Sequence, residues 1–230
     1  MIPVSVCMNT RNRRYQLEVA LPSVMAQDPA EVVIVDDGST DGTEEMIRRD
    51  FPTVIYHRLM DTGYHKNPAE SLNIATDASS QPVIIQQNAE LMSVNHCFSL
   101  LLDALQPRRP TLARIFNVGL GQAEDVPPWG TPERATCAAA RHGQTWYDVA
   151  PYDLVQRQEV GSEVYCGHER RRPLFFLGAM TRELWEEIGG YNEDIEKGTD
   201  QEFADRLRGA GVSCLGLGDA IGFHIQHGRD

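Results

Sequence analysis

Short apolar runs alternate with apolar stripes at helical spacing through the first half of the chain. The runs predict strands at 2–8, 32–36, 54–59, 83–86 and 112–118. The stripes between them predict helices at 15–26, 43–49, 68–75 and 98–105. Strands and helices in this order are joined by right-handed crossovers. We therefore expect an α/β domain in which a mostly parallel central sheet is flanked by helices on both faces.

The pattern becomes irregular from 119 to about 173, a segment that carries prolines and several aromatic residues. A long irregular insertion in a compact domain is usually either functional or disordered. Its aromatic content favours a partly ordered loop. Regular patterns then return, with strands predicted at 174–177, near 212–217 and at 220–225, and helices at 182–188 and 199–208.

The second predicted strand ends abruptly in acids, hydroxyls and glycines, in the order Asp36-Asp37-Gly38-Ser39-Thr40-Asp41-Gly42. Ligands of open α/β sheets bind just past the carboxyl ends of such strands, which predicts a binding crevice here. Gly38 and Gly42 permit the tight turn. Ser39 or Thr40 can cap the helix that follows. The same residues would also suit an ordinary polar turn.

Two further oxygen donors, Asn88 and Glu90, follow the strand predicted at 83–86. Their spacing places both side chains on the same side of an extended segment. The same residues fit a simple chain turn and a solvated surface acid.

A third polar segment, Gly198-Thr199-Asp200-Gln201-Glu202, starts a predicted helix. Thr199 and Glu202 form a capping-box pattern, and the helix dipole favours Asp200 in the first turn. Capping alone would account for these residues. A helix start would also fix the position of the Asp200 carboxylate.

These segments resemble the family 2 glycosyltransferases, which have the GT-A fold. The family text V-D-D-G-S-x-D matches 35–41, and the text G-G-[FY]-[DN]-E matches 189–193. The chain departs from the family's D-x-D motif, since Asn88 and Glu90 form an N-x-E variant. It departs again where Thr199 replaces the acid that usually precedes the base.

The resemblance extends from Val4 to about His227 and implies a single domain over 1–230. In that domain 1–118 would bind the nucleotide sugar, while 119–230, with its irregular insertion at 119–173, would bind the acceptor and carry the catalytic base. The implied activity is metal-dependent, inverting transfer of a sugar from a nucleotide-diphosphate donor to a saccharide hydroxyl. A UDP-sugar is the expected donor.

The resemblance also implies a role for each matching residue. The base would be Asp200, and the donor contacts would be Thr10, Arg11, Asp36 or Asp37, Lys66 and Asn88. The metal would be held by Glu90 with His224 or His227, and the acceptor by Trp129, Trp146, Tyr147 and Glu202. The expected ion is Mn²⁺, with Mg²⁺ as the alternative. Lys66 also fits a solvated loop lysine, and the three aromatic residues also fit anchors that pin the loop to the core.

Composition narrows the function classes. The net charge of −12 argues against a nucleic-acid binder, since phosphate backbones need a basic face. It is compatible with a nucleotide sugar, because a bound metal supplies local positive charge. The five cysteines are odd in number and form no CxxC pair, which favours reduced thiols and a cytoplasmic location. No apolar run is long enough to span a membrane, so any membrane contact would be peripheral.

Two other interpretations stay open. A non-catalytic or degenerate nucleotide-sugar-binding module would account for the departures at Asn88, Glu90 and Thr199. A phosphate-accepting receiver domain would use the Asp36–Asp37 pair, but it leaves the second half of the chain unexplained.

Overall fold

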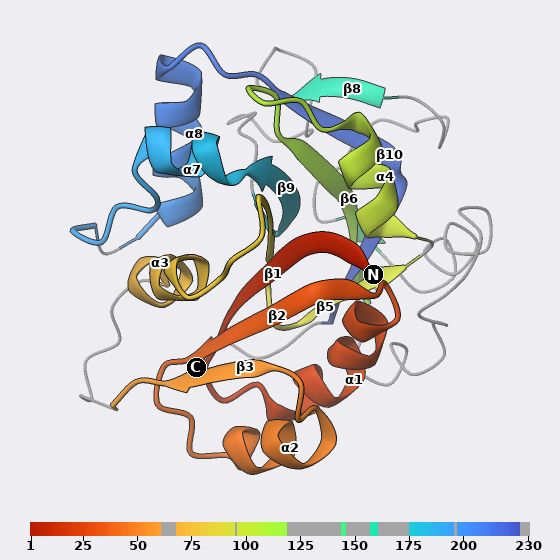
Figure 1. Cartoon of the computed structure of the whole chain (residues 1–230), viewed down its shortest axis with the longest axis vertical. Coiled ribbons are helices and arrows are strands. Elements are labelled where there is room, and N and C mark those ends of the chain that lie inside the picture. The colour runs from red at the N-terminus through yellow and green to blue at the C-terminus, as the bar shows by residue number, and fades with distance from the viewer. Residues whose placement is uncertain are drawn as a thin grey trace.

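Two layers of helices enclose one mixed β-sheet in the part of the chain that the structure describes (Figure 1). This computed structural model describes residues 1–60, 68–94, 96–118, 144–145, 157–160, 175–195 and 197–225. The ten strands are β1 (Ile2–Thr10), β2 (Pro29–Asp36), β3 (Ile55–Arg58), β4 (Val83–Gln87), β5 (Leu91–Val94), β6 (Thr111–Val118), β7 (Gln144–Thr145), β8 (Arg157–Val160), β9 (Leu177–Thr181) and β10 (Cys214–Ile225). The helices are α1 (Arg14–Met25), α2 (Thr43–Asp50), α3 (Ala69–Asp77), α4 (Cys97–Ala104), α7 (Arg182–Ile188) and α8 (Thr199–Gly209).

The strand order is β3-β2-β1-β4-β9-β6-β10-β5, with β7 paired to β6 and β8 paired to β10. Strands β3, β2, β1 and β4 pair in parallel, as do β6 and β10. Strand β9 is antiparallel to both β4 and β6, and β5 is antiparallel to β10. It follows that β1, β2, β3, β4, β6 and β10 share one direction. The α/β fold class is therefore confirmed, with the antiparallel strand β9 inserted in the middle of the sheet.

Successive residues of the central strands face opposite cores because side chains alternate along a strand. Val6, Ile34 and Ile85 face the core that also contains buried residues of α1, α2 and α4. Cys7 and Ile84, by contrast, face the core that contains residues of α3, α7 and α8. Figure 1 shows α1 and α2 together on one side of the sheet and α3, α7 and α8 on the other. Helices on both faces are therefore confirmed.

The predicted segments differ from the observed ones at β9, at β10 and at three strands that were not predicted. The strand expected at 174–177 begins later, as β9 (Leu177–Thr181). The two strands expected near 212–217 and at 220–225 form one long strand, β10, with a register shift between Leu217 and Ile221. Strands β5, β7 and β8 were not predicted, and the last two lie in the segment expected to be irregular. None of the described helices combines the length and the apolar character needed to cross a membrane.

Candidate functional site

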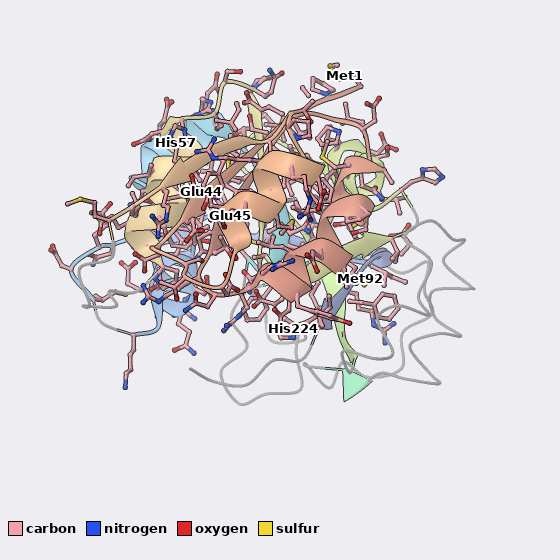
Figure 2. The ribbon with its side chains drawn as sticks, turned by 90° about the horizontal axis from the view of Figure 1, so that it is seen from below. Met1, Glu44, Glu45, His57, Met92 and His224 are labelled. Atoms are coloured by element: carbon pink, nitrogen blue, oxygen red, sulfur yellow. The ribbon has the colours of Figure 1, made fainter. Side chains whose placement is uncertain are left out.

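The shared direction of the main strands brings seven of the predicted site residues to one edge of the sheet, namely Thr10, Arg11, Asp36, Asp37, Asn88, Glu90 and His224. Strands β1, β2 and β4 end at Thr10, Asp36 and Gln87, and β10 ends at Ile225. Met1, at the opposite end of β1, and His224, near the end of β10, lie at opposite sides of the view in Figure 2. This carboxyl edge is where a ligand of an open α/β sheet is expected to bind.

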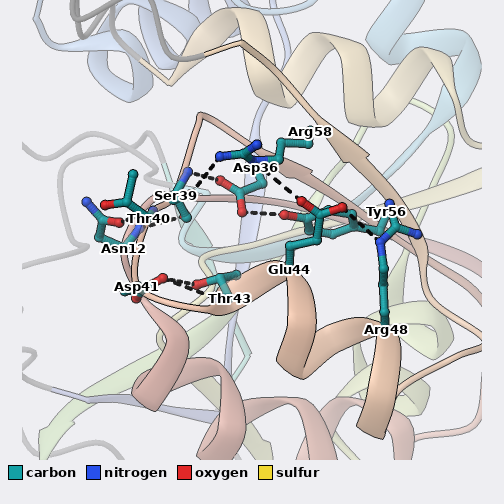
Figure 3. A network of polar contacts seen from close by, with 10 residues as sticks. All are labelled: Asn12, Asp36, Ser39, Thr40, Asp41, Thr43, Glu44, Arg48, Tyr56 and Arg58. Carbon is teal, nitrogen blue, oxygen red and sulfur yellow. Dashed lines mark hydrogen bonds and ion pairs between the residues drawn. The ribbon is translucent and has the colours of Figure 1, made fainter.

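Asp36 is completely buried, and both oxygens of its carboxylate accept hydrogen bonds. Oδ1 accepts from the backbone N–H of Ser39 at 2.7 Å, and Oδ2 accepts from the hydroxyl of Tyr56 on β3 (Figure 3). Burial, together with the hydrogen bond to Asp36, raises the pKa of Tyr56 well above its ordinary value, so its hydroxyl stays protonated and can donate. Asp36 therefore holds the turn after β2 in shape.

A cluster of ion-paired side chains from α2 and β3 lies next to the hydrogen bond between Asp36 and Tyr56. Glu44 on α2 pairs with Arg48 at 2.9 Å and with Arg58 at 3.6 Å. The Arg48 guanidinium lies 5.3 Å from the centre of the Tyr56 ring, and Arg58 donates to the carbonyl of Ser39 at 3.0 Å. These contacts fix the side of the turn that faces α2 and β3 (Figure 3).

The loop after β1 is fastened to the loop after β2. Asn12 Oδ1 accepts from the backbone N–H of Thr40 at 2.9 Å, and the backbone N–H of Asn12 donates to the hydroxyl of Ser39 at 2.8 Å. Asp41 accepts from the N–H of Arg14 at 2.9 Å and from the hydroxyl of Thr43 at 2.6 Å. Burial alone would raise the pKa of Asp41, but these hydrogen bonds lower it below its ordinary value.

The predicted capping of α2 by Ser39 or Thr40 is wrong. The N-cap position is Gly42, with φ 87°, and Asp41 satisfies the N–H of Thr43 at 3.1 Å. Ser39 and Thr40 bind the neighbouring loop instead. The tight turn expected from Gly38 and Gly42 is confirmed, since both have positive φ.

Three other predicted donor contacts lie where the loops after β1 and β2 begin. They are Thr10, Arg11 and Asp37. The N–H of Asp37 donates to the carbonyl of Thr10 at 2.9 Å, and the Arg11 guanidinium donates to the carbonyl of Asp37. Within the described residues, the Asp37 carboxylate has no hydrogen bond or ion pair, and the buried hydroxyl of Thr10 has no partner. Of the two adjacent acids, Asp37 is therefore the one whose carboxylate is available to a ligand.

The turn after β4 brings Glu90 against His224 on β10. Glu90 Oε1 lies 3.3 Å from His224 Nε2, and the N–H of Ile225 donates to the carbonyl of Glu90 at 2.9 Å. The Glu90 side chain is 14% exposed, whereas that of His224 is only 4% exposed. Asn88 is partly buried on the same turn, two residues before Glu90. The predicted pairing of a turn carboxylate with a C-terminal histidine is consistent with this geometry.

These residues fit a divalent cation. Carboxylate, imidazole and amide oxygen together form a donor set suited to Mn²⁺. Among the residues described, no group of three or more His, Cys, Asp or Glu side chains could hold a metal on its own. The Glu90–His224 pair would therefore need Asn88, diphosphate oxygens or a residue outside the described ranges to complete its coordination.

Asp200 lies in the first turn of α8, beside the aromatic cluster of Tyr191, Phe203, Trp185 and Phe175. Burial raises the pKa of Asp200 from 3.8 to about 6. Burial, and then the nearby Asp200 charge, raises the pKa of Tyr191 well above its ordinary value. Asp200 remains partly accessible and, within the described part of the chain, has no hydrogen bond or ion pair. A desolvated carboxylate of this kind is suited to accepting a proton near neutral pH.

The capping-box interpretation of α8 is wrong. The N-cap is Gly198, with φ 81°, and no side chain caps the helix start. Glu202 instead pairs with Arg206, through contacts of 2.6 Å to Nε and 2.9 Å to Nη2. Its two oxygens are thus occupied, and its contact with an acceptor stays a prediction.

Five of the predicted site residues lie outside the described ranges, namely Lys66, Trp129, Trp146, Tyr147 and His227. Their roles stay predictions. Conversely, sequence reasoning missed Tyr56 and Arg206. The signal for Tyr56 was the need of a strand-end acid for a partner on the adjacent strand, and the signal for Arg206 was its spacing of four from Glu202 on a helix.

The sequence matches the model of one protein family, Glycosyl transferase family 2, over residues 5–159. No curated protein is similar enough in sequence to count as a match.

Several solved structures share the fold. The mannosyltransferase PcManGT from Pyrobaculum calidifontis, solved with GDP-Man and Mn²⁺, is 20% identical with a TM-score of 0.62, over 99% of this chain and 58% of that one. TarS residues 1–349 from S. aureus is 16% identical with a TM-score of 0.67, over 98% and 60%. GalNAc-T7, solved with UDP, GalNAc and Mn²⁺, is 14% identical with a TM-score of 0.68, over 100% and 44%. The chain thus spans about half the length of these proteins, and at such identities the likeness concerns the fold alone.

Proposed function

The chain belongs to glycosyl transferase family 2, and from that premise we propose that it transfers a sugar from a nucleotide-diphosphate donor to a hydroxyl of a saccharide acceptor. The transfer is metal-dependent and inverts the anomeric centre. The donor is a UDP-sugar. Residues 1–118 bind the donor, and 119–230 bind the acceptor and supply the base.

The observation that carries this proposal is the Glu90–His224 pair, because it joins two segments distant in the sequence at the carboxyl edge of the sheet. Glu90, His224 and Asn88 would hold Mn²⁺, with the N-x-E sequence replacing two aspartates. When bound, the ion neutralises charge on the departing diphosphate, so that the nucleotide leaves without being protonated. Two of the similar structures were solved with Mn²⁺ and a nucleotide or nucleotide sugar, which supports this choice.

Donor recognition is assigned to Asp37, Arg11 and Thr10. The Asp37 carboxylate accepts hydrogen bonds from the base or ribose, while Asp36 keeps its structural contacts. The Arg11 guanidinium, anchored on the Asp37 carbonyl, supplies positive charge near the nucleotide. Lys66 adds a second cation from outside the described ranges.

Asp200 is the general base. It takes the proton of the acceptor hydroxyl as that oxygen bonds to the anomeric carbon and the bond to the diphosphate breaks. Attack from the face opposite the leaving group inverts the centre. A pKa raised to about 6 leaves the carboxylate mostly ionised at neutral pH and still basic enough to accept a proton. The buried, free cysteines Cys7, Cys97 and Cys214 are consistent with a cytosolic site of action.

The decisive experiment compares Asp200→Asn with Asp205→Asn, a control on the same helix, where Asp205 pairs with Arg208. UDP-, GDP- and dTDP-sugars are tested with Mn²⁺ for donor hydrolysis or transfer, and nucleotide binding is followed by thermal shift. We expect Asp200→Asn to lose about 10³-fold or more in turnover while it keeps nucleotide affinity, and Asp205→Asn to resemble wild type.

A non-catalytic binding module is the second candidate, favoured by the neutral Asn88 and by the ion-paired Glu202. Such a module would bind nucleotide with Mn²⁺, but wild type would neither hydrolyse nor transfer the sugar of any donor. That outcome would refute the enzymatic proposal.

A further inference from the structure

A chain of buried polar side chains runs beneath the turn that carries Asn88 and Glu90. Gln87 and Ser93 are linked, since the Ser93 hydroxyl donates to Gln87 Oε1 at 2.8 Å. The N–H of Ser93 donates to the hydroxyl of Ser23 on α1 at 2.9 Å. Gln27, in the turn after α1, donates from its Nε2 to the Ser93 carbonyl at 3.5 Å and accepts from the N–H of Phe98 at 3.2 Å. The four polar side chains are all at most 8% exposed.

Gln87 closes the turn across its base. Its Nε2 donates to the carbonyl of Leu91 at 2.6 Å, so the residue before the turn holds the first residue after it. Leu91 is opposite His224 in the β5–β10 ladder. The same hydrogen bond therefore ties the turn to the strand pair that presents His224.

The backbone of the turn is fastened at three further points. Asn88 N–H donates to the carbonyl of Phe176 at 3.0 Å, and Leu91 N–H donates to that of Asn88 at 3.1 Å. Ile225 N–H donates to the carbonyl of Glu90 at 2.9 Å. Gln87 is the side chain that adds to these main-chain bonds, so it limits how far Asn88 and Glu90 can move relative to His224.

A buried glutamine here needs a reason, because Ile85, which lies two residues earlier on β4 and on the same side of the sheet, is apolar. Burying polar groups is unfavourable unless they are paired, and a paired network fixes one geometry where apolar packing allows several. Both hydrogen-bonding ends of Gln87 are paired, and both pairs lie in the segment that starts at the turn.

Gln86 provides an internal comparison. It is also 1% exposed, but it faces the opposite side of the sheet, where its Nε2 donates to the hydroxyl of Thr76 at 2.9 Å. Within the described residues its Oε1 has no partner. Gln86 thus has the same chemistry and burial as Gln87 on the same strand, without contact to the turn.

We propose that Gln87, with Ser93 as its partner, is a positioning residue for a divalent-cation site, holding the turn so that Asn88 and Glu90 face the ion together with His224. This inference rests on the proposed function. It assigns to the buried side chain a part in metal affinity rather than in general stability.

The test compares Gln87→Leu with Gln86→Leu in the full chain. Mn²⁺ is titrated in the presence of UDP, and the free ion is measured from its electron paramagnetic resonance signal. Because residues that orient metal ligands typically contribute about 10- to 100-fold to affinity, we expect Mn²⁺ to bind Gln87→Leu about 10-fold more weakly. We expect Gln86→Leu to stay within about twofold of wild type, and UDP binding without metal to be unchanged in both variants.

Ser93→Ala keeps the inference testable if Gln87→Leu does not fold. It removes the hydrogen bond to Gln87 Oε1 and is expected to weaken Mn²⁺ binding about two- to fivefold, in a variant whose turn backbone is intact. The proposal would be overturned if the Gln87 and Ser93 variants that fold bind Mn²⁺ as tightly as wild type. It would also be overturned if Gln86→Leu lost as much Mn²⁺ affinity as they do. A wild-type protein that binds no Mn²⁺ with UDP would instead contradict the metal-dependent function itself.

Discussion

The side chain of Asn73 on α3 hydrogen-bonds both backbone polar groups of Tyr191. Asn73 Oδ1 accepts from the N–H of Tyr191 at 2.9 Å, and Nδ2 donates to its carbonyl, also at 2.9 Å. Nδ2 also donates to the Glu193 carboxylate at 2.8 Å. From the other side, Arg206 donates to the carbonyls of Ile188 and Gly190, each at 2.6 Å. The turn that precedes α8 and Asp200 is therefore held from two elements.

We expect Asn73→Ala to lower the free energy of unfolding by about 2–4 kcal/mol, because two backbone groups of the buried Tyr191 lose their partners. Urea unfolding measures this. Asn192→Ala is the matched control, since Asn192 Oδ1 accepts a single local bond from the N–H of Asp194 at 3.0 Å. Its expected loss is below about 1 kcal/mol. Equal losses in the two variants would contradict the role of Asn73.

Activity is expected to depend on pH through Asp200. Only the ionised carboxylate can accept a proton, so kcat/KM should rise with pH and level off above about pH 6, where burial places this pKa. Initial rates measured at saturating Mn²⁺ between about pH 4.5 and 8 test this expectation. Carboxyl groups with ordinary pKa values near about 4 are mostly ionised over this range, so they contribute little to the profile. A profile that is flat down to about pH 4.5 would exclude Asp200 as the base.

Asp200→Asn should stabilise the protein at neutral pH. The folded-state pKa of about 6 exceeds the ordinary 3.8, so the folded form binds more protons and wild-type stability falls as pH rises through this interval. The asparagine variant lacks this penalty. We expect it to gain about 1–3 kcal/mol above pH 6 and nothing below about pH 4. Thermal unfolding of wild type and Asp200→Asn at pH 4 and at pH 7.5 tests whether the gain in stability appears only at the higher pH.

The two adjacent acids should behave differently. Tyr56→Phe leaves one oxygen of the buried Asp36 without its donor and should cost about 1–3 kcal/mol of unfolding free energy. Asp37→Asn should leave stability within about 0.5 kcal/mol, since its carboxylate has no described partner, and should weaken UDP binding by about 10-fold. Denaturation and calorimetric UDP titration of both variants provide the comparison. A stable Tyr56→Phe protein would refute the structural role of this contact.

Gly178 and Gly209 should respond oppositely to alanine. A Cβ at Gly178 on β9 would lie 2.6 Å from Leu112 Cδ2 and 2.9 Å from the carbonyl oxygen of Thr111, whereas one at Gly209 on α8 would meet nothing within 4 Å. We expect Gly178→Ala to destabilise by about 1–3 kcal/mol and Gly209→Ala to stabilise by about 0.5 kcal/mol. Thermal unfolding tests both, and a neutral Gly178→Ala would indicate that β9 can move away from β6.

The hydrophobic pattern predicted most helices and strands because their burial is local and periodic. The helix α7 (Arg182–Ile188) begins and ends where its stripe does. Strand β5 (Leu91–Val94) escaped because its four residues include a buried serine and owe their extended form to pairing with β10. The start of β9 was misplaced because Gly178 and Ala179 have no strong strand pattern, although their small size lets β9 pack between β4 and β6.

The sequence predicted those site residues that belong to a motif. It could not predict roles that depend on which side chains the fold brings into contact. Motif resemblance indicated Glu90, His224 and Asp200. The sequence could not separate Asp36 from Asp37, because the difference depends on the β2–β3 register that brings Tyr56 to Asp36. Glu202 looked like a cap or an acceptor contact, yet the Arg206 side chain one helical turn away binds it.

The insertion of β9 between β4 and β6 has a consequence for synthesis of the chain. Strand β4 is complete at Gln87, but the strand that covers its second edge begins only at Leu177, roughly 90 residues later. At a typical elongation rate that interval lasts about 5–20 s, during which the apolar edge containing Ile84 and Ile85 has no partner strand. An unpaired edge of this kind is a template for aggregation, so we expect the nascent chain to be most prone to aggregate during this interval.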